Sequence, residues 1–186
     1  MNYHDIKKCD MLNGDGIRVS LWVSGCEHNC SQCQNPQTWD IGSGIPFDKE
    51  AEEELLDAIN KDYISGITFT GGDPLHEDNL EDVLNLINKI RLLLPDKTIW
   101  LYSGYTWDDI WECNTSGTSL NGDIWKGWTI DRCQRQDIIR LCDVFIDGRY
   151  INKLRDVTLK WRGSSNQRVI DVKKTLEENT VVLYAE

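Results

Sequence analysis

The strongest constraint on this fold is a group of three cysteines that directly follows an apolar segment. Residues 17–23 are mostly apolar, which predicts a buried β-strand over residues 18–23. Cys26, Cys30 and Cys33 come next, in the pattern C-x3-C-x2-C. The fold must therefore place three thiols close together in one short loop at the end of a buried strand.

This spacing points to an iron–sulfur cluster. Three thiolates on one loop can bind three irons of a 4Fe–4S cluster, because such clusters take cysteine thiolates as ligands. No fourth cysteine follows at ligand spacing, so one iron would keep an open position for a substrate or cofactor. We therefore expect Cys26, Cys30 and Cys33 to be the metal ligands of a reactive cluster.

Two other uses of the cysteines need weighing. A structural zinc site takes four Cys or His ligands, and His28 could be the fourth, although it lies between two of the cysteines. A disulfide staple is disfavoured because the chain has seven cysteines, an odd number, and enough length to form a core. The remaining cysteines lack ligand spacing and are expected to be reduced, partly buried thiols; they are Cys9, Cys113, Cys133 and Cys142.

Length and charge restrict the class of protein. The 186 residues predict a single domain over 1–186. A net charge of −11 argues against nucleic acid and against an anionic membrane surface as partners, since both need a basic face. The N-terminal residues contain no apolar stretch of the kind found in signal peptides. We expect a cytoplasmic protein in a reducing compartment, which suits free thiolates.

Strand-like and helix-like segments alternate, which predicts an α/β fold with a parallel sheet. The expected strands are residues 18–23, 66–70, 98–102 and 144–148, and the expected helices follow Asp48 and span residues 80–94. Residues 108–136 lack a sustained period and are interpreted as a possible insertion or partner-facing loop. The chain is too short for a closed barrel of eight β/α units, which needs about 250 residues.

A second motif follows the second expected strand. Gly71-Gly72-Asp73-Pro74 stands where a parallel strand ends, and function gathers at such ends in α/β folds. Paired glycines let the backbone approach a ligand closely. The alternative is an ordinary strand-to-helix turn that Asp73 caps.

The two motifs together resemble those of the radical S-adenosylmethionine superfamily, which combines a C-x3-C-x2-C loop with a Gly-Gly-Glu/Asp-Pro strand end. Four further segments are similar to the activating proteins of anaerobic ribonucleoside-triphosphate reductase; they are residues 13–18, 100–107, 143–148 and 160–168. This resemblance reaches from the N-terminus to about residue 170, with 108–136 as the main exception. It implies a partial, laterally open (β/α) barrel.

The resemblance also implies roles for individual residues. Cys26, Cys30 and Cys33 would hold the 4Fe–4S cluster. S-adenosylmethionine would be bound by the residues around the third cysteine and by the glycine turn; these are Gln32, Cys33, Gln34, Asn35, Gly71, Gly72 and Asp73. No catalytic acid, base or nucleophile is expected beyond the cluster and cofactor. The chain departs from related loops at Gln32 and Gln34, because an aromatic residue usually stands beside the third cysteine.

The activity implied by the resemblance is the reductive cleavage of S-adenosylmethionine, which generates a glycyl radical on the large subunit of anaerobic ribonucleotide reductase. A flavodoxin-like protein would supply the electrons. Two alternatives remain open from the residues alone. One is an activase of another glycyl-radical enzyme, such as pyruvate formate-lyase. The other is a non-catalytic iron–sulfur or zinc-binding electron-transfer module.

Two arginines near the C-terminal end have undecided roles. Arg162 and Arg168 could bind the cofactor carboxylate or the partner, because arginine contacts carboxylates in a bidentate manner. A structural ion pair with one of the chain's many acidic residues is the alternative for each. Asp147 and Arg149, which follow the fourth expected strand, could touch the cofactor but are interpreted as part of a turn.

Overall fold

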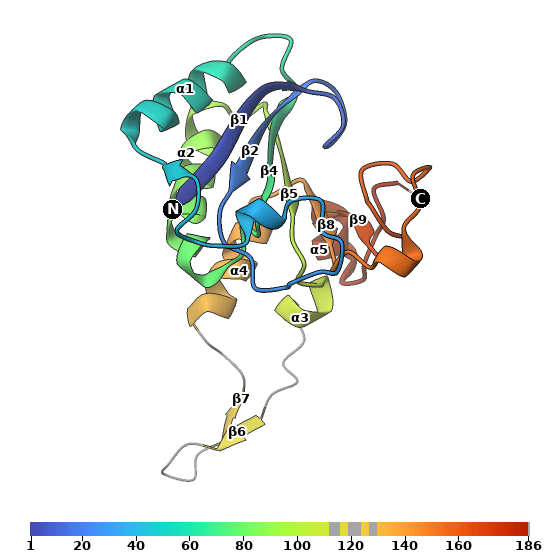
Figure 1. The fold of residues 1–186 in the computed structure, drawn as a ribbon. Coiled ribbons are helices and arrows are strands. Elements are labelled where there is room, and N and C mark those ends of the chain that lie inside the picture. The colour runs from blue at the N-terminus through green and yellow to red at the C-terminus, as the bar shows by residue number, and fades with distance from the viewer. Residues whose placement is uncertain (112–115, 119–123, 127–129, 186) are drawn as a thin grey trace.

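A seven-stranded sheet organises the molecule. Figure 1 shows the arrangement of its elements in the computed structural model. The structure describes residues 1–111, 116–118, 124–126 and 130–185. The order of the strands in this sheet is β3-β1-β2-β4-β5-β8-β9, so β3 and β9 are its edges. The mixed α/β class expected from the sequence is confirmed.

The centre of the sheet is parallel. Strands β2 (Arg18–Val23), β4 (Gly66–Gly71), β5 (Thr98–Tyr102) and β8 (Val144–Asp147) pair in parallel with their neighbours. Their bounds agree with the expected strands to within one residue. Because parallel strands end at the same edge of a sheet, the cysteine loop after β2 and the glycine turn after β4 become neighbours.

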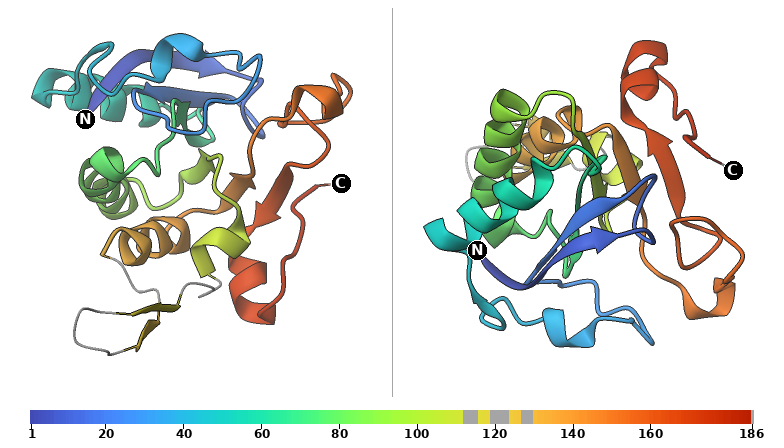
Figure 2. Two further views of the ribbon diagram at one scale, coloured as in Figure 1. Left: turned by 60° about the horizontal axis from the view of Figure 1, so that its bottom comes forward. Right: turned by 90° about the horizontal axis from the view of Figure 1, so that it is seen from above.

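Three helices connect these strands. Helix α1 (Lys49–Ile59) begins directly after Asp48, as expected, and the Asp48 carboxylate caps it by accepting the N–H of Ala51 at 3.0 Å. Helix α2 (Leu80–Leu93) ends just before Pro95, and helix α4 (Ile130–Arg140) precedes β8. Figure 2 shows the three helices together on one side of the sheet.

Alternation along the strands gives the sheet two different faces. Leu21, Phe69 and Leu101 point toward the helices and are fully buried in the main core. The opposite face carries a smaller cluster formed by Trp100, Val144, Ile146 and Val169, with Tyr102 and Trp161 against it. The helix-free face is therefore the side on which a ligand can approach the strands.

Three strands of the seven-stranded sheet were missed by the sequence analysis. Strand β1 (Asn2–Asp10) pairs antiparallel with β2 and with the short β3 (Ile45–Pro46), and β9 (Arg168–Asp171) pairs antiparallel with β8. The pairing of β1 with β2 is interrupted by register shifts, which explains why β1 shows no regular alternation. Helix α5 (Val172–Glu178) follows β9 directly.

The segment 108–136, interpreted as an insertion, is described in part. It includes most of helix α3 (Trp107–Trp111), the hairpin of β6 (Ser116–Thr118) and β7 (Ile124–Lys126), and the start of α4. Its other residues, among them Cys113, lie outside the described part. Ile138 and Ile139 of α4 are fully buried, so this helix belongs to the core. None of the described helices is long and apolar enough to cross a membrane.

Candidate functional site

A cavity of about 470 Å³ opens at the carboxyl ends of the parallel strands, on the face without helices. Its wall includes Trp22 of β2, Thr70 of β4 and Tyr102 of β5, which alternate with the buried core residues. The size lies within the range of small-molecule sites, which is about 300–1,000 Å³. The cavity is therefore large enough for a cofactor-sized ligand.

All three candidate ligands of the cluster reach this cavity. Cys26, Cys30 and Cys33 line it, and each is a free, partly exposed thiol. The base of their loop is closed by backbone hydrogen bonds, from Gly25 N–H to the Thr38 carbonyl at 2.8 Å and from Cys26 N–H to the Trp39 carbonyl at 3.0 Å. These hydrogen bonds fix the base of the loop, and its three cysteines line the cavity.

The environment of Cys26 and Cys30 favours the protonated form of these two thiols when no metal is bound. Burial raises the pKa of Cys26 to about 12. Burial also raises the pKa of Cys30, while the backbone N–H of Tyr150 and the charge of Arg149 oppose this shift. Metal binding to such thiols must release protons. Tyr150 and Arg149 also show that the chain after β8 lies beside the cysteine loop.

The turn after β4 fits against the base of the cysteine loop. Gly72 N–H donates to the Val23 carbonyl at 2.8 Å, and Asp73 N–H donates to the Gly25 carbonyl at 2.6 Å. Gly71 has a φ of +102°, a conformation that favours glycine. A Cβ atom added to Gly72 would lie 2.4 Å from the Gly25 carbonyl oxygen. Both glycines are therefore required by the approach of two backbones.

The Asp73 carboxylate joins three strand ends. Its Oδ2 atom accepts hydrogen bonds from His28 Nε2 at 2.6 Å, Ser103 Oγ at 2.9 Å and Gly104 N–H at 3.0 Å. Its Oδ1 atom accepts the N–H of Leu75 at 2.8 Å, which is the turn cap considered in the sequence analysis. Asp73 is 1% exposed. This carboxylate therefore fixes the cysteine loop, the glycine turn and the end of β5 relative to one another.

From the sequence, His28 was considered as a fourth zinc ligand, and both its burial and its contact with Asp73 were missed. The ring is buried, lies edge-on to Tyr105 at 4.7 Å between centroids, and would collide with a Cβ atom at Gly104. Its Nδ1 atom is buried without a hydrogen-bond partner in the structure. No pattern in the sequence connects His28 with Asp73, because the contact depends on how the two loops pack.

The sequence matches the family model described as a 4Fe-4S single cluster domain over residues 12–170. It is also 37% identical over 171 residues to the anaerobic ribonucleoside-triphosphate reductase-activating protein of Escherichia coli (strain K12), covering 91% of this chain and 97% of that protein. The chain belongs to the family of anaerobic ribonucleoside-triphosphate reductase-activating proteins. Proteins with the same name from Enterobacteria phage T4 and Vibrio cholerae are 38% and 35% identical, each over 169 residues; the matches cover 91% and 90% of this chain and 93% and 96% of those proteins.

The site of this family member suits a 4Fe–4S cluster by its donor set. Three thiols line one cavity, and the cavity also receives a turn without side chains. Within the described residues, no group of three or more His, Cys, Asp or Glu side chains could hold a single metal ion. A cluster does not need that convergence, because its three thiolates bind three different irons.

The other residues expected at the cofactor divide into two groups. Gln34 and Asn35 line the cavity together with Gly71, Gly72 and Asp73. Gln32 is exposed, has a φ of +60° and is not among the cavity-lining residues. A contact between any of these residues and a cofactor stays a prediction.

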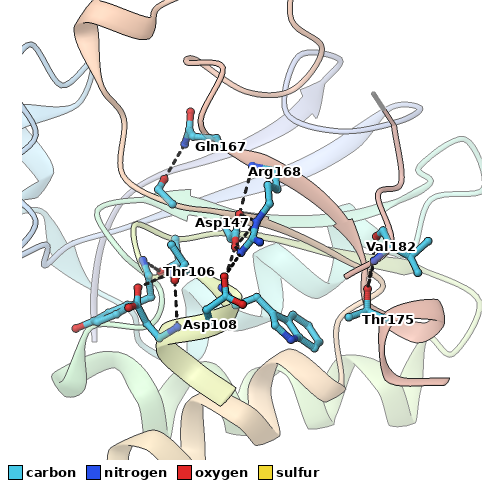
Figure 3. Close-up of polar contacts among 12 residues, drawn as sticks. Thr106, Asp108, Asp147, Gln167, Arg168, Thr175 and Val182 are labelled. Atoms are coloured by element: carbon cyan, nitrogen blue, oxygen red, sulfur yellow. Dashed lines mark hydrogen bonds and ion pairs between the residues drawn. The ribbon is translucent and has the colours of Figure 1, made fainter. Parts of the chain in front are cut away.

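The two undecided arginines have different surroundings in this activating-protein fold. Arg162 lines the cavity, where its Nη1 atom donates to the Gln167 carbonyl at 2.9 Å. Arg168 instead forms ion pairs with Asp147 at 2.5 Å and Asp108 at 3.0 Å, as Figure 3 shows. Arg168 and Asp147 are therefore structural partners, and Arg162 is the arginine at the cavity.

Proposed function

We propose that this protein activates anaerobic ribonucleoside-triphosphate reductase by generating a glycyl radical on its large subunit. The observation that carries the proposal is the meeting of two motifs in one cavity. Cys26, Cys30 and Cys33 stand on one side, and the Gly71-Gly72-Asp73 turn approaches from the neighbouring strand. The names of the relatives supply the target protein.

In this proposal the three thiolates hold a 4Fe–4S cluster, and the cavity beside them receives S-adenosylmethionine. When bound, the cluster and S-adenosylmethionine together supply a one-electron reductive cleavage that produces an organic radical. The backbone of Gly71 and Gly72 offers a surface without side chains for the amino-acid part of the cofactor. Gln32, Gln34 and Asn35 are proposed as further cofactor contacts around Cys33.

The chain's own residues would position and shield the reaction. Asp73 and His28 hold the cysteine loop against the glycine turn. Trp22, Tyr102 and Trp161 form an aromatic part of the cavity wall, which would limit the access of water on that side. No side chain is required as an acid or base in this scheme.

We further propose that residues 1–186 form one domain of the radical S-adenosylmethionine type, a partial (β/α) barrel that is open at its side. Four parallel strands with helices on one face support this proposal. So does the sheet order, in which the edges β3 and β9 are not paired with each other. An open side would admit a segment of another polypeptide, which a closed barrel would exclude.

An external reductant must supply the electron, and we propose a flavodoxin-like protein in a reducing cytoplasm. The free thiols of Cys9, Cys133 and Cys142 agree with such a compartment. Neither nucleic acid nor a membrane is needed as a partner.

Anaerobic EPR spectroscopy tests the proposal. The protein is reconstituted with iron and sulfide, reduced with dithionite and measured with and without S-adenosylmethionine. We expect a 4Fe–4S signal that changes when the cofactor is added. A cluster indifferent to the cofactor would indicate electron transfer, and bound zinc in place of a cluster would contradict the proposal.

A second stage tests the target. The reduced protein and S-adenosylmethionine are incubated in parallel with anaerobic ribonucleotide reductase and with pyruvate formate-lyase. We expect the doublet of a glycyl radical only in the reductase. A doublet only in pyruvate formate-lyase would show that the protein activates a different glycyl-radical enzyme.

A further inference from the structure

The segment after β8 has a charge opposite to that of the whole molecule. Residues 149–162, called here the basic rim, contain five basic residues and one acidic residue, whereas the chain has a net charge of −11. The basic residues are Arg149, Lys153, Arg155, Lys160 and Arg162. None of them forms an ion pair with a carboxylate among the described residues. Among the residues that the structure describes, no direct ion pair therefore compensates the positive charge of the basic rim.

The basic rim also exposes apolar side chains. Residues 151–158 are all exposed, and Val157 is 78% exposed. Ile151 and Leu154 are exposed on the same segment. Adjacent exposed apolar side chains bordered by charges are typical of a protein interaction site rather than of a free surface.

The basic rim has a defined shape. It contains the short 3₁₀ helix η3 (Asn152–Leu154), and Ser165 N–H donates to the Leu154 carbonyl at 2.9 Å. Arg155 and Ser164 also form an isolated β-bridge. A segment held in this way loses little conformational entropy when a partner binds.

The basic rim borders the mouth of the cavity that holds the cysteines. Tyr150, Leu159 and Arg162 line that cavity, and so does Leu12 of the β1–β2 turn. Met11 and Leu12 are 72% and 74% exposed. In both views of Figure 2 the β1–β2 turn lies beside the orange segment that contains the basic rim. Exposed apolar side chains thus stand on two sides of the opening.

We infer that the basic rim, together with Met11 and Leu12, is the docking surface for the polypeptide substrate. This inference rests on the proposed function, which requires a glycine of another protein to reach the cavity. The complementary surface of the substrate protein would carry carboxylates around an apolar centre. A second copy of this acidic chain would satisfy the charge, but at this position it would cover the mouth of the cavity.

Charge reversal in the basic rim tests the electrostatic contribution to docking. The variant Lys153→Glu/Arg155→Glu is compared with Lys49→Glu/Lys61→Glu, which makes the same change in net charge at the two ends of α1. Each cluster-loaded protein is assayed for cleavage of S-adenosylmethionine without reductase, and for glycyl-radical yield against the concentration of anaerobic ribonucleotide reductase.

We expect the rim variant to raise the half-saturating concentration of reductase about tenfold, because charges at an interface rim mainly control association. Its cleavage of S-adenosylmethionine without reductase should stay within about twofold of the wild type, because neither position contacts the cavity. The α1 variant should behave as the wild type in both assays. For the wild type, added salt should raise the half-saturating concentration of reductase.

Three results would contradict the inference and are distinguishable. An unchanged half-saturating concentration of reductase in the rim variant would show that the basic rim is not the docking surface, while the proposed function would stand. Loss of cofactor cleavage without reductase would place these residues in the cofactor site instead. Absence of any glycyl radical with the wild-type protein would overturn the proposed function itself.

The apolar part has its own test. Met11→Ser/Val157→Ser is compared with Leu92→Ser, which removes an exposed leucine from α2. We expect the half-saturating concentration of reductase to rise in the double variant and to stay unchanged in Leu92→Ser. Sedimentation analysis of the wild type and the double variant tests the alternative that a second copy of this chain binds to the surface. Self-association that the double variant abolishes, with unchanged saturation, would show that this surface binds a second copy and would overturn the inference.

Discussion

At the scale of single residues, the hydrogen bond between His28 and Asp73 is the contact that most directly fixes the geometry of the candidate site. Both side chains are buried, and their bond joins the cysteine loop to the end of β4. We predict that His28→Ala retains the cluster but weakens the binding of S-adenosylmethionine about tenfold, the lower end of the losses caused by removing outer-shell partners. The measurement is a titration of the cluster's EPR signal with the cofactor.

The control for this substitution is His4→Ala, since His4 contacts Ser43 away from the cavity. Equal cofactor affinity in His28→Ala and the wild type would contradict a positioning role for His28. Partial rescue by His28→Gln, whose amide can donate to Asp73, would support that role, because a merely space-filling side chain would not need a donor.

Gly72 is predicted to tolerate no side chain. From the sequence, a bulky residue there would be expected to crowd only the cofactor turn. The structure adds the overlap of a Cβ atom with the carbonyl of Gly25, next to the first cysteine. We therefore expect Gly72→Val to lose iron as well as cofactor binding, measured as iron per protein after reconstitution. Gly42→Val is the matched control, because a Cβ at Gly42 has its nearest neighbour at 3.4 Å; normal iron content in Gly72→Val would contradict this account.

At the scale of elements, one buried carboxylate connects β8, β9 and α3. Asp147 is 1% exposed, pairs with Arg168 of β9, and accepts the N–H of Trp107 at 2.8 Å at the start of α3 (Figure 3). Removing one partner of a buried ion pair leaves the other charge unsatisfied. We predict that Arg168→Met lowers the free energy of unfolding by about 2 kcal/mol, since the guanidinium is partly exposed.

Urea denaturation measures this loss of stability. Asp108→Asn serves as the comparison, because it removes only the exposed partner of Arg168 and should cost less than about 1 kcal/mol. Similar losses in the two variants would show that the buried pair with Asp147 has no special weight.

The same elements show what the sequence can predict. Strands β2, β4, β5 and β8 were predicted because continuous apolar runs between polar segments are typical of buried parallel strands. Strand β1 and strand β9 were missed because one is irregular in register and the other has only four residues. Short edge strands are defined by their pairing with a neighbour, which the local sequence does not encode.

The candidate site divides in a similar way. The meeting of Cys26, Cys30 and Cys33 with the glycine turn follows from the rule that parallel strands end together. The contact of His28 with Asp73 and the burial of Arg18 do not follow from any spacing. Arg18 is fully buried, donates to Thr68 Oγ1 at 2.8 Å and to the Ile67 carbonyl at 2.6 Å, and lies over the ring of Trp100. Such contacts depend on which polar groups the neighbouring strands bring next to the side chain, and this is known only once the strands are paired.

At the scale of the whole molecule, the hydrophobic core is independent of the cysteine loop. The main core lies between the sheet and its helices, and none of the three candidate ligands contributes to it. We predict that the cluster-free protein folds and unfolds in one cooperative thermal transition, followed by far-UV circular dichroism. A cluster-free protein without such a transition would indicate that metal drives folding, as in zinc fingers.

The closed base of the cysteine loop has a consequence for the order of events in the cell. Backbone hydrogen bonds of Gly25, Cys26 and Asp73 secure the base, whereas the tip holds the turn in which Cys33 N–H donates to the Cys30 carbonyl. Amide hydrogen exchange in the cluster-free protein should therefore be slow at the base and fast at the tip. Iron and sulfide would then be inserted into an already folded protein, so the chain could fold first and be activated later, when a cluster can form.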